Sequence, residues 1–290
     1  MIIKVVHAAL FFCLKLIIAI NQQDDKPLLG MTVPVEVSIV KTASTHELNI
    51  SAPSDDNIAP CVRYRTAESN DPTGQQDVAE DIQIPPSILL LTKRYPETKV
   101  LIQYYKEINK DPDYYSRKID ISEDLATDDV PLFLQWDKRW AFLNYGRHTM
   151  IASSGCAPTC LSMALCYFKI GDALNPKAIA DFSYENGYYV EYCGTYSSLF
   201  TSGAAAFGLK SREIEKNQIT MQKNLDDGKL IVALMDYGHF TKNGHYILIK
   251  NYDNDGNFLV NDPNSLINST HAWKPEVIIG EARNLWALSF

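Results

Sequence analysis

The chain has 290 residues, 46% of them hydrophobic and 21% charged, which is typical of one large globular domain or of a smaller domain with an N-terminal attachment. Its formal net charge of -8 repels phosphate backbones, and no basic cluster interleaved with aromatic residues offsets it, so we expect no nucleic-acid partner. The six cysteines form neither a regular, even framework nor two Cys-x-x-Cys pairs, so neither a disulfide-stapled fold nor structural zinc is indicated.

The first twenty residues differ from the rest of the chain. Lys4 precedes an apolar run over residues 5–20, and a positive flank before such a run is typical of a signal peptide or of a short membrane anchor facing outward. Lys15 splits the run, and residues 18–20 make a poor cleavage site, so an ordinary buried helix is the alternative. We therefore predict export, with membrane attachment through residues 1–20 if they are retained.

The next hundred residues are mostly polar. Residues 21–84 are rich in Asp, Gln, Ser, Thr and Pro and contain little that could build a core. Apolar residues return at helical spacing between Pro85 and Lys110, which predicts one or two helices, and a polar connector follows that ends near Asp129. We interpret residues 21–128 as a poorly ordered tether with one or two helices, serving as a spacer or pro-region.

Residues 129–290 contain more apolar segments, separated by clear turn signals, and they form the predicted main domain. Proline, asparagine and glycine signals predict helices first, over residues 156–169, 176–186, 196–207 and 218–227. Continuous apolar runs and an Asn-Asp-Gly turn then predict strands, over residues 230–235, 246–249, 258–260 and 285–290. This order predicts an α+β fold of two layers, with N-terminal helices packed on an antiparallel sheet.

Cys156 is the strongest candidate nucleophile. It starts a predicted helix, where backbone N–H groups and the positive end of the helix dipole favour a thiolate, and Gly155 leaves room for a substrate carbonyl. A small buried core cysteine is the alternative interpretation, and it suits Cys160 and Cys166 better because they lie further along the same helix. For Cys193 the sequence offers no partner, and we interpret it as structural or incidental.

A thiolate nucleophile needs a base, and His245 alone among the six histidines stands at the head of an apolar strand, after Gly244. Asp262 follows at the end of the next strand, and the tight turn between the two strands would return it to the histidine. There its carboxylate could accept the Nδ1 proton and steady the imidazolium. Taken singly, the histidine is as well explained by a structural role and the aspartate by an ordinary Asp-Pro turn.

Several short motifs follow one another in this domain: VPLFLQWDKRW at 130–140, GCAPTC at 155–160, GYY at 187–189, GHYI at 244–247, NDPN at 261–264 and NLW at 284–286. Together they resemble the bacterial peptidases of family thirty-nine, papain-clan enzymes that include the bacteriocin-leader (double-glycine) peptidases. The resemblance covers about residues 129–290 and fits a stand-alone, secreted or envelope-associated subgroup. It implies a papain-like cysteine proteinase fold that needs no metal or cofactor.

The resemblance also implies roles for four residues. Cys156 would be the nucleophile, His245 the general base and acid, Asp262 the residue that orients the histidine, and Gln135 the side-chain donor of an oxyanion hole whose second donor is the Cys156 backbone N–H. The chain departs from the leader peptidases in the gap of 21 residues between the glutamine and the cysteine (156 − 135), so Gln135 must fold back over an insertion. Ala157 is a second departure, since related sequences usually carry glycine there.

The implied reaction is hydrolysis of a peptide bond through a thioester acyl-enzyme, with a peptide or protein as the partner. Two alternatives stay open: a non-catalytic module of the same fold that binds peptides or cell-wall fragments, and an amidase or transferase that uses the same triad. Four tyrosines at positions 188, 189, 192 and 196 either line a cleft or pack against the helix beneath them. The expected location is secreted, or membrane-anchored and facing outward, at the bacterial cell envelope.

Overall fold

The structure is a computed structural model that describes residues 83–171 and 174–290, which fall within one compact unit. The predicted signal or anchor at residues 1–20 lies outside the described residues, and within them no helix is long and apolar enough to span a bilayer. The helices are α2 Pro86–Arg94, η1 Pro96–Lys99, α3 Val100–Ile108, η2 Asp124–Ala126, α4 Ile151–Ser154, α5 Cys156–Tyr167, α6 Pro176–Glu185, η3 Ser197–Phe200, α7 Ser202–Ala206, α8 Gln218–Asp226, α9 Leu266–Ser269 and α10 Pro275–Glu281. The strands are β1 Asn144–Tyr145, β2 Thr149–Met150, β3 Tyr189–Val190, β4 Gly194–Thr195, β5 Lys210–Ile214, β6 Leu230–Met235, β7 His245–Tyr252, β8 Phe258–Asn261, β9 Ala272–Trp273 and β10 Ala282–Ser289.

A six-stranded antiparallel sheet is the centre of the domain, with the strand order β5-β10-β6-β7-β8-β9. All six residues of β6 are buried. Because side chains alternate along a strand, Leu230, Val232 and Leu234 belong to one apolar cluster. The other three residues of β6 belong to a second cluster on the opposite face. A strand buried on both faces reads as a continuous apolar run, which is how β6 was predicted.

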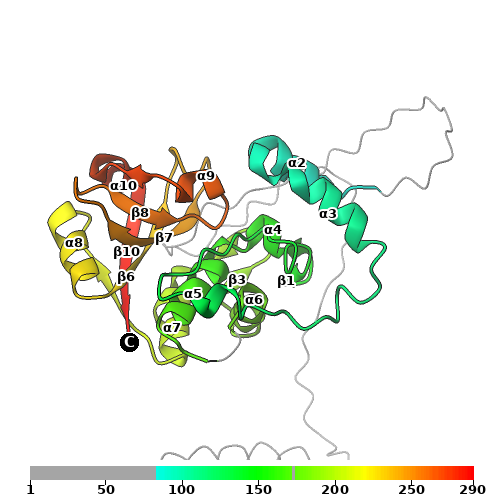
Figure 1. Cartoon of the computed structure of the whole chain (residues 1–290), viewed down its shortest axis with the longest axis horizontal. Coiled ribbons are helices and arrows are strands. Elements are labelled where there is room, and N and C mark those ends of the chain that lie inside the picture. Colours follow the sequence, from blue (N-terminus) through cyan, green and yellow to red (C-terminus); the bar gives the residue numbers. More distant parts are fainter. Residues whose placement is uncertain (1–82, 172–173) are drawn as a thin grey trace, which may run out of the picture. The chain divides into compact units, whose positions relative to one another are not determined.

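Helices cover both faces of this sheet, so the predicted two-layer arrangement is incomplete (Figure 1). The first face packs against α5 and α7, as the helix-then-strand order predicted, and α6 packs on α5. The second face is covered by α8 and α10, through residues such as Met221, Leu225 and Ile278. The alternation along β6 explains the extra layer, since the second set of apolar side chains also has to be removed from water.

Most of the predicted helices begin and end where the turn residues indicated. Asn175 caps α6 by accepting hydrogen bonds from the backbone N–H groups of Lys177 and Ala178, both at 3.1 Å. The helix predicted over residues 196–207 is instead two short helices, η3 and α7, because Thr201 adopts a non-helical conformation with φ −110° and ψ −87°. The edge strand β5 was not predicted, since three of its five residues are exposed and its sequence is polar.

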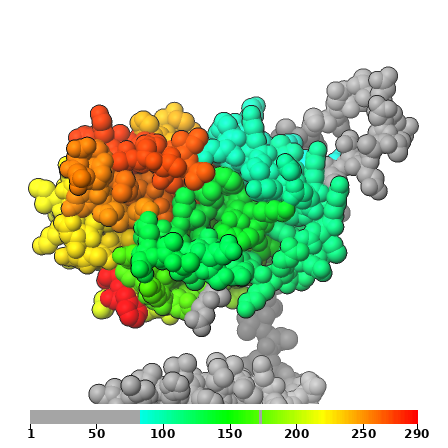
Figure 2. Space-filling view, in the orientation of Figure 1, coloured from blue at the N-terminus to red at the C-terminus, as the bar shows by residue number. Residues whose placement is uncertain are grey.

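The helices predicted between Pro85 and Lys110 are present as α2 and α3, and they pack into the core instead of lying along a tether. Ile88 and Leu101 are fully buried in the same apolar cluster as α5. Glu97, in the turn between α2 and α3, accepts hydrogen bonds from the Ser265 hydroxyl and from the Ile267 backbone N–H. Figure 2 shows this cyan segment seated against the orange and green parts of the chain. The main domain therefore includes residues that precede position 129.

Candidate functional site

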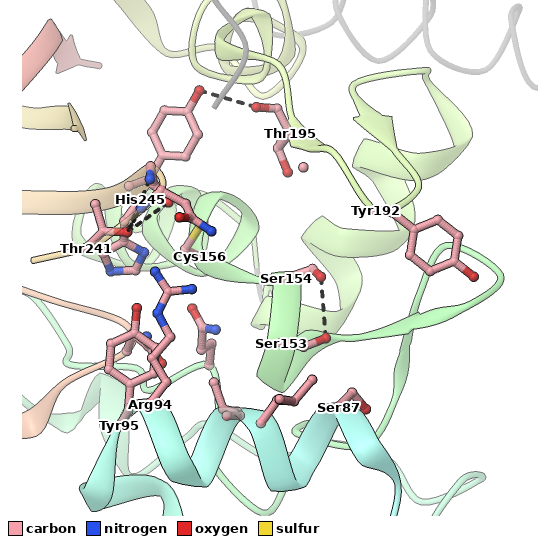
Figure 3. Close-up of a pocket in the computed structure, with 18 of the residues that line it drawn as sticks. Ser87, Arg94, Tyr95, Ser153, Ser154, Cys156, Tyr192, Thr195, Thr241 and His245 are labelled. Carbon is pink, nitrogen blue, oxygen red and sulfur yellow. Dashed lines mark hydrogen bonds between the residues drawn. The ribbon is translucent and has the colours of Figure 1, made fainter. Parts of the chain in front are cut away.

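A pocket of about 570 Å³ lies where α2, the start of α5 and the start of β7 meet (Figure 3). Cys156, His245 and Gln135, three of the four predicted site residues, line it. Asp262 lies behind His245, hydrogen-bonded to its ring. The fold therefore brings together four residues that span 128 positions of the sequence (262 − 135 + 1).

Cys156 is the first residue of α5, so its side chain lies at the positive end of a twelve-residue helix. Among the described residues, no acceptor is bonded to the Cys156 backbone N–H, which leaves that donor available to a ligand in the pocket. Gly155 has a steric role: a Cβ there would lie 2.6 Å from both the carbonyl oxygen and the Cγ2 atom of Ile151. The tight junction between α4 and α5 thus requires glycine just before the thiol.

The other described cysteines are chemically different from Cys156. Cys160 is fully buried inside α5, and its burial, with the nearby Cys156 and Asp262, raises the pKa of its thiol well above the usual range. Burial also raises the pKa of Cys166 to about 12. Cys193, for which the sequence offered no partner, is disulfide-bonded, so its role is structural. Of the described cysteines, only Cys156 combines a free thiol with a helix start in a pocket.

His245 is the first residue of β7, and its Nε2 atom lies 2.6 Å from Oδ1 of Asp262. Both side chains are nearly inaccessible, with 6% and 1% of their surface exposed. The prediction that Nδ1 faces the carboxylate was therefore wrong. Asp262 follows the end of β8 and bonds to Nε2 of the ring. Nδ1 is therefore the nitrogen available to Cys156. Which ring nitrogen is used depends on the ring's orientation, which sequence spacing does not specify.

The carboxylate of Asp262 is itself held by further donors. Its Oδ1 also accepts the backbone N–H of Asn264 at 2.8 Å, and its Oδ2 accepts the side-chain amide of Asn268 at 2.8 Å. Burial opposes a charged imidazole, but the charge and hydrogen bond of Asp262, together with those of Cys156, outweigh it and raise the pKa of His245 well above its usual range. The site therefore favours an imidazolium, the form that stabilises a neighbouring thiolate.

Gln135 reaches the pocket in spite of the long insertion. Its backbone N–H donates to the carbonyl of Pro263 at 2.7 Å, so it is tied to the loop that carries Asp262. Its side chain is buried, and Nε2 donates to the carbonyl of Ala152 at 2.7 Å, while Oε1 has no partner among the residues that the structure describes. An amide nitrogen carries two hydrogens, so one donor remains for a ligand. The insertion itself forms the β1–β2 hairpin and α4, which return the chain to the start of α5.

The comparison with known proteins identifies the family. The sequence model of the Peptidase_C39 like family matches residues 127–287, more than half of the chain. The chain belongs to this family. Its papain-like α+β fold follows, and the predicted resemblance to family thirty-nine is confirmed. Membership also indicates a cysteine-peptidase-like function at the coarse level. No curated protein matches the chain.

Two features of the pocket go beyond the residues predicted from the family's motifs. The helix α2 forms one wall, although it lies outside the region that matches the Peptidase_C39 like family. Of the four tyrosines considered for the cleft, only Tyr192 lines the pocket, while Tyr189 stacks on Tyr145 and Tyr188 on Phe182. Among the residues that the structure describes, no group of three or more His, Cys, Asp or Glu side chains could hold a metal ion.

Proposed function

We propose that this member of the Peptidase_C39 like family is an active cysteine peptidase that hydrolyses peptide bonds. The observation that carries the proposal is the buried contact between Asp262 and His245, whose ring lines the same pocket as a thiol at a helix start. Burying an aspartate is costly unless it is paired, and here the pairing holds an imidazolium beside Cys156. A module that only bound peptides would gain nothing from this arrangement.

The proposed reaction is acyl transfer in two steps. In the first step, the Cys156 thiolate forms a bond to the carbonyl carbon of the scissile amide, and the carbonyl electrons move onto oxygen. The imidazolium of His245 gives its Nδ1 proton to the departing amine as the C–N bond breaks, which leaves a thioester on Cys156. In the second step, the neutral imidazole takes a proton from water, the hydroxide attacks the thioester, and the thiolate and imidazolium are restored.

Two donors are available for the oxyanion that forms in each step. One is the backbone N–H of Cys156, which has no acceptor among the described residues, and the other is the remaining N–H of the Gln135 amide. Removing one such donor typically costs about 2.7–4 kcal/mol of transition-state stabilisation. The hydrogen bond from Gln135 to Ala152 fixes the orientation of the amide before a substrate binds, which is what an oxyanion hole requires.

The proposed substrate is a peptide or protein, and the proposed location is outside the cytoplasm. Two observations support this location: the positive flank and apolar run of residues 1–20, and the disulfide at Cys193. Disulfides persist in oxidising compartments and are rare in the cytosol. The apolar run would supply either a removable signal or an outward-facing anchor.

The test uses the full-length protein incubated with a mixed peptide library, with cleavage read by mass spectrometry. Cleavage by the wild-type protein that is lost in Cys156→Ala and kept in Cys166→Ala supports a peptidase, since Cys166 is a thiol on the same helix outside the pocket. Peptides that bind but are never cut would favour the binding module instead. Products in which the new C-terminus is joined to an added amine, instead of ending in a free carboxylate, would favour a transferase.

A further inference from the structure

The charged residues of the pocket are all of one sign. Lys93 and Arg94, both from α2, line it together with His245, and no Asp or Glu side chain is among the described residues that line it. The chain as a whole carries a net charge of -8. The described lining of the pocket therefore has the opposite sign of charge from the whole chain. Such a local excess of one charge concentrates ligands of the opposite charge.

Arg94 has no carboxylate partner within the described part of the chain. Its guanidinium lies 5.4 Å from the centre of the neighbouring Tyr95 ring, and it forms no ion pair there. Figure 3 shows the side chain rising from α2 into the pocket, on the side of Cys156 and His245. Other arginines of the domain, such as Arg139 and Arg283, are engaged by aspartates. No described residue therefore occupies the guanidinium of Arg94 with a charge of its own, and it can bind a group that enters the pocket.

The wall that carries Arg94 is fixed to the domain. Ile88 and Leu91 bury the inner side of α2, and just beyond the helix Glu97 accepts hydrogen bonds from Ser265 and from the Ile267 backbone. Ser265 lies three residues after Asp262, so the loop that positions His245 also holds the end of α2. A cation on an anchored helix is positioned in advance, which lowers the entropy lost when a ligand binds.

We propose that Arg94, assisted by Lys93, binds a carboxylate of the substrate, so that this site selects acidic peptides. The planar guanidinium offers two parallel N–H donors that match the two oxygens of a carboxylate. The carboxylate comes either from an Asp or Glu side chain close to the cleaved bond or from the free C-terminus of a short peptide. This inference rests on the proposed function in that it takes the ligand to be a peptide.

The first test compares two alkylating reagents of similar size, iodoacetate and iodoacetamide, which differ by one carboxylate charge. The ratio of their rates at Cys156 is measured on the full-length protein by mass spectrometry. We expect Arg94→Gln to lower the iodoacetate-to-iodoacetamide ratio about tenfold, as expected for the loss of one charge-assisted hydrogen bond. Arg212→Gln removes the same charge from an exposed arginine outside the pocket and should leave the ratio as in wild type. Equal ratios in wild type and Arg94→Gln would overturn the proposal.

The second test needs no reactive thiol and separates the two sources of the carboxylate. Binding to the full-length Cys156→Ala protein is measured for peptide pairs that differ only in Glu against Gln, or only in a C-terminal acid against an amide. Tighter binding of one acidic member, lost in Arg94→Gln, supports the site and names the source. Equal binding within both pairs overturns it, even if the wild-type protein cleaves peptides. A charge preference without any cleavage would keep the carboxylate site and reject the peptidase.

Discussion

Replacing Asp262 by asparagine tests whether the buried carboxylate makes Cys156 reactive. Three donors converge on that carboxylate: the His245 ring, the Asn264 backbone N–H and the Asn268 amide. The new side chain has nearly the same shape, and its single oxygen can keep the first two donors. The side-chain amide of Asn268 can turn to present its oxygen to the new NH₂ group. Asp262→Asn therefore removes a charge and leaves the geometry largely in place.

The size of the effect follows from the charge. Two unit charges about 4 Å apart attract each other by about 4 kcal/mol when the effective dielectric constant is about 20. That energy changes the ratio of imidazolium to neutral imidazole by about a thousandfold. A free thiol with a pKa of about 8.5 is about one part in 300 thiolate at pH 6. Loss of the imidazolium can therefore slow the reaction of Cys156 at pH 6 by about a hundredfold, with the difference vanishing near pH 9.

The assay is the rate of iodoacetamide alkylation at Cys156 from pH 5 to 10, followed by mass spectrometry on intact protein. Asp255→Asn is the matched control, because it makes the same chemical change at an exposed residue of the turn between β7 and β8. We expect alkylation at low pH to be fast in wild type and in this control, and to be slow in Asp262→Asn because the raised pKa of His245 depends on the carboxylate. An unchanged profile in Asp262→Asn would refute the reasoning, because it would show that the thiol is reactive without the buried carboxylate.

Further predictions concern the neighbours of the thiol. Gln135→Ala should lower kcat about a hundredfold or more with little change in KM, because the lost donor acts on the oxyanion. A rise in KM alone would assign Gln135 to substrate binding. Gly155→Ala should lower the free energy of unfolding in urea by about 1–3 kcal/mol, since its Cβ would lie 2.6 Å from two atoms of Ile151. An unchanged midpoint of urea unfolding would mean that the α4–α5 junction relaxes freely. The raised pKa of His245 should stabilise the wild type fully below pH 6.5, and the contribution should then fall by up to about 1.4 kcal/mol per pH unit as pH rises toward the folded-state pKa. His245→Gln should lack that slope in urea titrations, and equal slopes in both proteins would contradict the shift.

Local signals predicted the parts of the fold that depend on neighbouring residues. The asparagine and proline before α6, the glycine after α8 and the apolar run of β6 each produced the element that they indicated. The candidate site residues could be named from the sequence because Cys156, His245 and Asp262 each stand next to the end of an element, where a short motif marks both the turn and the side chain.

What the sequence did not indicate depends on packing between distant segments. The role of α2 as a wall of the pocket follows from contacts such as that between Glu97 and Ser265, which lie 168 positions apart. The strand β5 pairs with β10 at the sheet edge, so its stability comes from a partner and not from its own polar sequence. The choice of Nε2 for Asp262 reflects how the imidazole is oriented at the start of β7.

The nucleophile and its base come from different layers of the molecule, and this has a consequence for biosynthesis. Cys156 belongs to the helical layer, whereas His245 belongs to a central strand that forms its ladder only with β6 and β8. In a nascent chain we therefore expect the thiol and its base to stay apart until the helices dock on the sheet. The strand β10 lies between β5 and β6 in that sheet, so we expect the thiol and its base to come together only after β10 has joined the strands made before it.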